Sequence, residues 1–303
     1  MNTQVEIVPL EAEHLPGLQC LVAEHLRMAG YPFDAPTEVL RQRAALALGS
    51  DGLFAARRRW MVAAAVDNGR LVGAVRAYAV DRDAVGLKAE EDRVPADIAW
   101  LLFEPDRPAA GSALLDAALS WIGDDPEGIE AFDLGHGMGW CGGVPDTWLH
   151  VNAIVGRAGF EWSETSYLMW GSGPPAVSGD VNPEVQVTLD VTSDGTWQFW
   201  AQLDRVKVGE LLVKRMDAPT GWQPTWSGGR WIDWVHVEEP LRRRGIAAAM
   251  FAALAERARR SGVRRMAAST RYAAAIRLNE RIGMTNRLAL RRYVFPSGNP
   301  KDK

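Results

Sequence analysis

The chain has 303 residues, of which 47% are hydrophobic, and its formal net charge at pH 7 is -4. This length accommodates two ordinary domains with separate cores, and the apolar content favours a soluble globular protein. No apolar run is long enough to span a membrane, and no basic segment followed by an apolar stretch opens the chain. We therefore expect a cytoplasmic protein without membrane association. The two cysteines, Cys20 and Cys141, are too few for a disulfide framework and lack metal-ligand spacing, so we expect no metal site.

The first half of the sequence predicts strands and helices that alternate. The predicted elements are a strand at 5–10, helices at 11–29 and 36–48, a hairpin over 60–80 that turns at Asn68 and Gly69, a buried strand at 97–103 and a helix at 111–123. The stretch 171–183 is rich in Gly, Pro and Ser and has no periodic apolar pattern, which indicates a linker. We therefore predict an N-terminal domain at 1–172, a linker at 173–183 and a C-terminal domain at 184–303.

The second half repeats this order in shortened form. The predicted elements are a strand at 184–191, a hairpin of 196–204 and 207–216, a strand at 230–237, a helix at 246–260, a strand at 264–270, a helix at 272–284 and a strand at 286–295. The two helices that follow the first strand in the first half are missing here. Each half should form an α+β (mixed α/β) layer on one central sheet, which indicates an internal duplication.

Positive charge is concentrated in the second half. Between Pro240 and Arg292 there are fourteen arginines, against only Glu256 and Glu280. This segment predicts an anionic ligand, with nucleic acid, a phosphorylated cofactor and plain solvation of exposed helices as the open interpretations. Because aromatic residues are not interleaved with these arginines and the whole chain is acidic, we expect no binding to nucleic acid.

The segment "RRRGIA" (242–247) joins a predicted strand to a predicted helix. The start of a helix presents unpaired backbone amides and a partial positive charge, which together attract anions. Gly245 lets the backbone approach a ligand closely, and the small Ala247 leaves room above the first helical turn. The arginines add charge that phosphates can satisfy through forked hydrogen bonds. The segment therefore predicts a diphosphate site.

This segment resembles the phosphate-binding signature of the GNAT acetyltransferase superfamily: Arg or Gln, two residues, Gly, one residue, then Gly or Ala. A second signature, a helix that ends in Gly and an apolar residue, is matched by "AIRLNERIGM" (275–284). The resemblance covers 184–295 well and 1–170 less closely. It implies two tandem GNAT-like domains, each a mostly antiparallel central sheet flanked by helices, with a degenerate N-terminal copy. The arrangement is distantly similar to the mycothiol synthase-type acetyltransferases.

The resemblance implies acetyl-CoA as cosubstrate, bound by the C-terminal half. Its pyrophosphate would lie on the amides of 243–247, and its pantetheine would lie beside 235–237 like an added strand. The implied cofactor-binding residues are Val235, His236, Val237, Arg242, Arg243, Arg244, Gly245, Ile246, Ala247 and Asn279. In the N-terminal copy, Pro108 stands where the signature has Arg or Gln and has no backbone N–H to donate. We therefore expect the C-terminal half to perform the chemistry.

Acyl transfer to an amine requires a proton acceptor and a group that stabilises the departing thiolate. Asp233 is the preferred acceptor, although capping of a loop or pairing with an arginine is an equally open role for it. Alternation places Asp233 on one face with Val235 and Val237, unless a bulge changes the parity. Asn279 stands where the family often has a tyrosine; its amide can hydrogen-bond a sulfur but is no acid, which leaves Tyr272 as a candidate.

Several tryptophans precede or lie in the proposed catalytic strand. Trp222, Trp226 and Trp231 would line a pocket for a cationic or aromatic amine, or would form a hydrophobic core between hairpins. The sequence thus predicts an N-acetyltransferase that acts on a primary amine of a small molecule by direct attack in a ternary complex. The alternative is a non-catalytic acyl-CoA-binding sensor or assembly protein.

Overall fold

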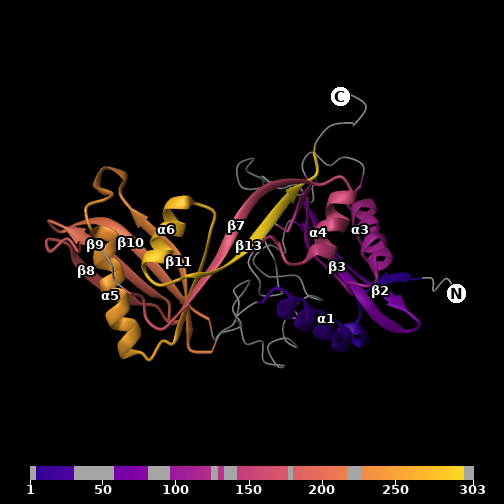
Figure 1. Ribbon diagram of the computed structural model, residues 1–303, viewed down its shortest axis with the longest axis horizontal. Coiled ribbons are helices and arrows are strands. Elements are labelled where there is room, and N and C mark those ends of the chain that lie inside the picture. The colour runs from indigo at the N-terminus through magenta and orange to yellow at the C-terminus, as the bar shows by residue number, and fades with distance from the viewer. Residues whose placement is uncertain are drawn as a thin grey trace. The chain divides into compact units, whose positions relative to one another are not determined.

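The computed structural model describes residues 5–30, 58–80, 96–123, 129–132, 142–176, 180–216 and 227–296. The chain divides into two compact units. Unit 1 comprises Met1–Thr165, Gly221–Gln223 and Leu290–Lys303, and unit 2 comprises Ser166–Thr220 and Pro224–Ala289. In Figure 1 each unit contains a β-sheet with helices packed on it, as predicted for a mixed α/β class.

Unit 1 contains a sheet in the strand order β1-β2-β3-β4-β5-β13, with β6 paired to β13. The elements in chain order are β1 (Glu6–Pro9), α1 (Leu15–Met28), β2 (Arg58–Asp67), β3 (Arg70–Val80), β4 (Ala96–Phe103), α3 (Pro108–Ile122), β5 (Ile129–Ala131), β6 (Val144–Pro145) and α4 (Leu149–Arg157). The predicted hairpin turn is confirmed, because Asn68 and Gly69 both have positive φ angles, 51° and 76°. The predicted helix at 36–48 lies outside the described residues.

Unit 2 contains a sheet in the order β7-β12-β11-β10-β9-β8. The elements are β7 (Glu161–Ser172), which enters this unit at Ser166, β8 (Gln186–Val191), β9 (Trp197–Leu203), β10 (Val206–Arg215), β11 (Gly229–Val237), α5 (Ile246–Arg260), β12 (Arg265–Thr270) and α6 (Ala273–Arg281). β13 (Asn286–Val294) begins in unit 2 and belongs to unit 1 from Leu290. A short 3-10 helix, Glu239–Leu241, follows β11. As predicted, β8 leads into β9 through a short turn at residues 192–196, with no helix between them.

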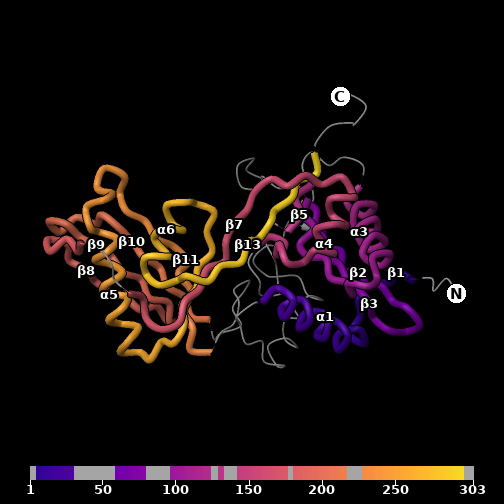
Figure 2. The backbone as a smooth tube through the Cα atoms, viewed as in Figure 1, coloured from indigo at the N-terminus to yellow at the C-terminus, as the bar shows by residue number. Residues whose placement is uncertain are grey.

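The last strand of each half belongs to the sheet of the other half. β7 pairs with β12 from Tyr167↔Thr270 to Ser172↔Arg265, inside unit 2. β13 returns to unit 1, where Tyr293 pairs with Ala131 on β5. Figure 2 lets the reader follow the chain out along β7 and back along β13. Each of these two strands therefore runs from one compact unit into the other.

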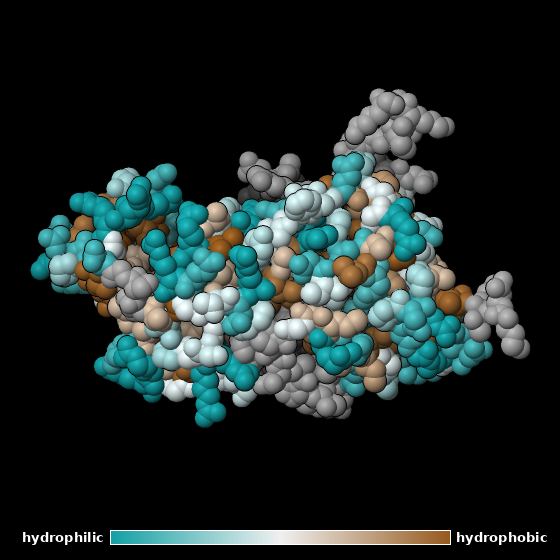
Figure 3. All heavy atoms as spheres, in the orientation of Figure 1, coloured by the Kyte–Doolittle hydropathy of each residue, from teal (hydrophilic) through white to brown (hydrophobic). Residues whose placement is uncertain are grey.

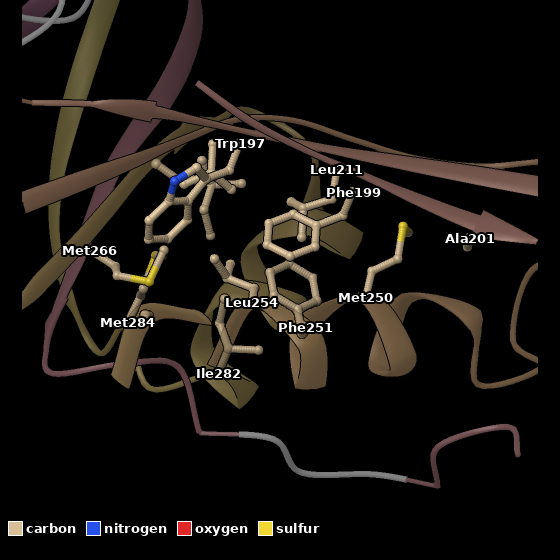
Figure 4. Packing of buried hydrophobic residues seen from close by; sticks show 14 of the residues in the cluster. Trp197, Phe199, Ala201, Leu211, Met250, Phe251, Leu254, Met266, Ile282 and Met284 are labelled. Atoms are coloured by element: carbon tan, nitrogen blue, oxygen red, sulfur yellow. The ribbon is translucent and has the colours of Figure 1, made fainter. Parts of the chain in front are cut away.

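α5 covers one face of the unit 2 sheet. The apolar face of this helix is buried, with Met250, Phe251, Leu254 and Ala258 all at 1% exposure or less. Figure 4 shows Phe251 and Leu254 directed toward Trp197, Phe199 and Leu211 on the sheet. Burial of these large apolar side chains holds α5, and hence the turn before it, against the strands.

The other face of β8–β11 carries polar and aromatic side chains. Among the described helices of unit 2, α5 packs against β8–β11 and α6 packs against β12.

On the side of the molecule in Figure 3, hydrophobic residues form scattered patches between hydrophilic ones. None of the described helices combines the length and apolar character required to cross a membrane.

Candidate active site

β11 separates from its parallel neighbour in the middle of the unit 2 sheet. β11 and β12 pair from Gly229↔Arg265 to Ile232↔Ala268, and their pairing stops there. On its other edge β11 remains paired with β10 as far as Val237. Within the described part of the chain, residues 234–237 thus leave one strand edge without a partner from β12.

A β-bulge marks the point of separation. Across from β10, Trp234 pairs with Leu212 and Ile232 pairs with Val213, so Asp233 is the extra residue. Ile232 lies in the core cluster under α5, and Val235 packs against the same cluster. The alternation that placed Asp233 with Val235 and Val237 therefore does not hold. The bulge turns Asp233 away from this core.

The carboxylate of Asp233 meets a lysine. Its Oδ2 lies 2.7 Å from Nζ of Lys214, which stands on β10 opposite Trp231. The two side chains are 18% and 36% exposed, so the ion pair is only partly screened by water. Sequence reasoning missed Lys214, because only the strand register places it beside a residue far along the chain.

Trp234 and His236 lie on the same side of β11 as each other. Their rings are stacked at 6.2 Å with an interplanar angle of 12°, and Trp234 is 52% exposed. His236 Nε2 lies 3.7 Å from Oε1 of Glu238. Of the three predicted pocket tryptophans, Trp231 is buried at 2% exposure, and Trp222 and Trp226 lie outside the described residues.

The turn between β11 and α5 exposes a row of backbone amides. Arg243 and Gly245 have φ angles of 67° and 76°, and no side chain caps the start of α5. The amides of residues 243–248 donate to no acceptor within the described ranges. Left-handed residues in such a turn direct neighbouring amides into a common concavity, which suits an anion. Ile246 contributes its amide only, because its side chain is buried in the core.

The three arginines of the turn have different roles. Arg242 Nε donates to the carbonyl of Val237 at 3.1 Å, and its guanidinium lies 3.7 Å from Glu239. Arg243 and Arg244 are exposed and form no ion pair with any residue that the structure describes. Arg242 therefore braces the turn, whereas the other two guanidinium groups are available to a ligand.

The predicted linker supports this turn directly. A Cβ atom at Gly245 would lie 2.6 Å from the carbonyl oxygen of Asp180 and 2.8 Å from the amide nitrogen of Asn182. The Asn182 side chain donates to the carbonyl of Arg244 at 3.1 Å. Gly245 is thus required for contact with residues 180–182 as well as for its positive φ. The Asn-Pro pair at 182–183, a turn signal, is the sequence feature that could have revealed this support.

Of the two candidates for stabilising a thiolate, Tyr272 lies directly before α6 and Asn279 lies within it. Asn279 is buried at 4% exposure, and its Nδ2 lies 3.7 Å from the sulfur of Met169. Tyr272 precedes α6, is 62% exposed and accepts a hydrogen bond from Arg271 at its hydroxyl, at 3.1 Å. The side-chain amide of Asn279 thus contacts the thioether of Met169, which belongs to the same unit.

Unit 1 repeats the strand geometry of unit 2. β4 and β5 pair in parallel as far as Ile98↔Ala131. Opposite β3, Trp100 pairs with Arg76 and Ile98 pairs with Ala77, so Ala99 is the bulged residue. Ala99 in β4 therefore corresponds to Asp233 in β11, and this correspondence supports the predicted duplication.

Unit 1 nevertheless lacks the amide turn. Only residues 104–107 connect β4 to α3, whereas residues 238–245 connect β11 to α5. Gly111, three residues after Pro108, stands where the signature has its glycine. It lies inside α3, where a Cβ would be 2.6 Å from the ring of Phe103. Its small size serves helix-strand packing. The start of α3 therefore differs from the turn before α5, which suits an anion.

The strand of unit 1 that corresponds to β11 is buried along its whole length. Every residue of β4 is buried, and the ring of His150 on α4 packs edge-on against Phe103 at 4.9 Å. Nε2 of His150 lies 3.0 Å from Nε2 of His25 on α1, and burial lowers the pKa of His25 to about 4 and also lowers that of His150.

Comparison with known proteins identifies the segment that carries the turn. Residues 182–284 match the model of the acetyltransferase (GNAT) family. None of the curated proteins compared with the chain matches it.

Solved structures resemble the fold of almost the whole chain. A tandem GNAT protein from the clavulanic acid biosynthesis pathway is 15% identical with a TM-score of 0.61, and the match covers 98% of this chain and 99% of that one. A GCN5-related N-acetyltransferase from Sphaerobacter thermophilus is 14% identical with a TM-score of 0.64, covering 96% and 95%. At such identities the likeness concerns the fold, and it confirms two tandem GNAT-like units.

Proposed function

We propose that the chain is an N-acetyltransferase that uses acetyl-CoA, because residues 182–284 match the model of the GNAT acetyltransferase family. The acceptor is a primary amine of a small molecule. The observation that carries the proposal is the turn before α5, where the amides of 243–248 have no described acceptor and lie beside two exposed guanidinium groups.

The turn and the open edge of β11 suit the two halves of the donor. The diphosphate of acetyl-CoA accepts hydrogen bonds from the amides of the turn and neutralises Arg243 and Arg244. Pantetheine carries amide groups, and it adds to the free edge of Val235, His236 and Val237 like a further strand. This arrangement directs the thioester toward the bulge at Asp233.

Asp233 is the proton acceptor in this proposal. The amine loses a proton to the carboxylate, and the neutral nitrogen attacks the carbonyl carbon of the thioester. The C–S bond then breaks, its electron pair leaves on sulfur, and the nitrogen gives its second proton to water. Asn279 is buried beside Met169 and Tyr272 is exposed beside Arg271, so we propose that the proton taken up by Asp233 passes to the thiolate.

Unit 1 binds no donor in this proposal. Its connection between strand and helix is four residues long, and the side chains of β4 are buried along its whole length. One acetyl-CoA per chain is therefore expected.

Calorimetric titration with acetyl-CoA, followed by thiol release with a panel of amines, tests the function. The double change Arg243→Ala and Arg244→Ala should weaken donor binding at least about tenfold, a loss of about 1.4 kcal/mol. Arg259→Ala is the matched control, because Arg259 lies in the last turn of α5 and pairs with Glu256. Absence of donor binding refutes the proposal.

Thiol release and retention on DNA distinguish the proposed function from two others. Donor binding without thiol release above background would favour an acyl-CoA-binding sensor or assembly protein instead of an enzyme. Steeply salt-dependent retention on DNA would favour a nucleic-acid surface, and we expect none.

A further inference from the structure

Lys214 places a primary amine at the carboxylate that we assign to proton transfer. Its Nζ lies 2.7 Å from Asp233, at the bulge where the open edge of β11 begins. The ammonium group of an external acceptor would form the same contact with the same carboxylate. By its chemistry and its position, the lysine therefore stands where the acceptor amine is expected.

We propose that Lys214 is an internal acetyl acceptor, which the protein acetylates on Nζ in a single turnover when no external amine is present. This inference rests on the proposed function, because it uses the same donor and the same carboxylate.

The choice of lysine at this position is notable in an arginine-rich chain. Of the 34 basic residues, 29 are arginine and five are lysine, at positions 88, 207, 214, 301 and 303. An arginine would also pair with Asp233, and its forked guanidinium would hold the carboxylate in two hydrogen bonds. A guanidinium stays protonated, however, whereas a lysine can lose its proton and act as a nucleophile.

The acetylation of Lys214 uses Asp233, the thioester and water. The ammonium of Lys214 passes one proton to Asp233, and the neutral nitrogen attacks the carbonyl carbon of the thioester. The new N–C bond forms, the C–S bond breaks, and the sulfur leaves as a thiolate. The nitrogen loses its second proton to water, and the proton on Asp233 goes to the thiolate. The net reaction converts acetyl-CoA and lysine to acetyl-lysine, coenzyme A thiol and one proton.

Acetylation would change the site for later turnovers. It removes the positive charge of Lys214 and therefore the ion pair that holds Asp233. The freed carboxylate would then receive the ammonium of an external amine. Protein acetylated beforehand should show a lower KM for a cationic amine than unmodified protein.

The experiment exposes the unmodified full chain to acetyl-CoA without an amine and follows acetylation by intact mass and peptide mapping. We expect one acetyl group on Lys214, at a rate that rises with pH because only the neutral amine reacts. Asp233→Asn should slow this modification at least about tenfold while donor binding persists. Lys214→Arg should abolish it.

Lys207 provides the internal control. It also lies on β10, but its Nζ sits 3.6 Å from the ring centre of Trp200 and contacts no carboxylate among the described residues. The Lys207→Arg variant should acetylate Lys214 at the same rate as the unchanged protein. Equal acetylation of Lys207 and Lys214, or an unchanged rate in Asp233→Asn, would indicate uncatalysed chemistry and overturn the inference.

The amine panel distinguishes this inference from the proposed function. Turnover of amines with no acetyl on Lys214 would overturn the internal acceptor and leave the enzyme activity intact. Acetyl on Lys214 with no turnover of any amine would retain the internal acceptor and refute the small-molecule acceptor. Failure to bind acetyl-CoA would overturn both.

Discussion

Gly245→Ala tests whether residues 180–182 shape the turn between β11 and α5. Gly245 has a φ of 76°, and a Cβ there would lie 2.6 Å from the carbonyl oxygen of Asp180. The left-handed conformation costs an alanine roughly 1–2 kcal/mol. The contact with backbone atoms, which cannot rotate away, adds an overpacking cost of about 1–3 kcal/mol. We therefore expect the free energy of unfolding to fall by about 2–5 kcal/mol.

Gly262→Ala is the matched control for this change. Gly262 also has a positive φ, 64°, but nothing lies within 4 Å of its would-be Cβ. Urea denaturation should show only the conformational cost of roughly 1–2 kcal/mol, and calorimetry should show unchanged acetyl-CoA affinity. Gly245→Ala should weaken acetyl-CoA at least about tenfold, or about 1.4 kcal/mol. Equal donor affinity in the two variants would show that residues 180–182 do not shape the turn.

Three further predictions concern unit 1. Gly111→Ala should lower the free energy of unfolding by about 1–3 kcal/mol, because its Cβ meets the ring of Phe103, yet leave calorimetric acetyl-CoA affinity unchanged. Tyr293→Phe should cost about 1 kcal/mol in urea denaturation, because the Tyr293 hydroxyl donates to Asn152 at 2.5 Å. Burial lowers the pKa of His25 from 6.5 to about 4, so the unfolded state binds the extra proton between these values. The free energy of unfolding should therefore be undiminished above about pH 6.5 and should fall by about 3 kcal/mol as the pH drops to 4, a slope that His25→Gln should reduce.

The local elements of unit 2 could be predicted because their signals are local. The helix predicted at 246–260 is α5, and its apolar residues are the ones that are buried. The exchange of β7 and β13 could not be predicted, because pairing between strands far apart in the chain leaves no periodic trace in either one.

The candidate site shows the same division between local and long-range information. The turn at 242–247 was recognisable from its arginines and glycine, which act through their own backbone and charge. The bulge at Asp233 depends on the register with β10, and that register also brings Lys214 to the carboxylate. Alternation along a single strand therefore predicted the wrong face for Asp233.

The two units together indicate that the length of the connection, more than the glycine signature, determines where an anion site forms. Gly111 and Gly245 both fit the spacing of the signature, and both follow a bulged parallel strand. Four connecting residues start α3 at Pro108, so that Gly111 falls within the helix against Phe103. Eight connecting residues let Arg243 and Gly245 adopt left-handed conformations before α5 begins. Lengthening the connection of unit 1 would therefore be a necessary step toward a second donor site, and restoring an arginine at position 108 alone should not create one.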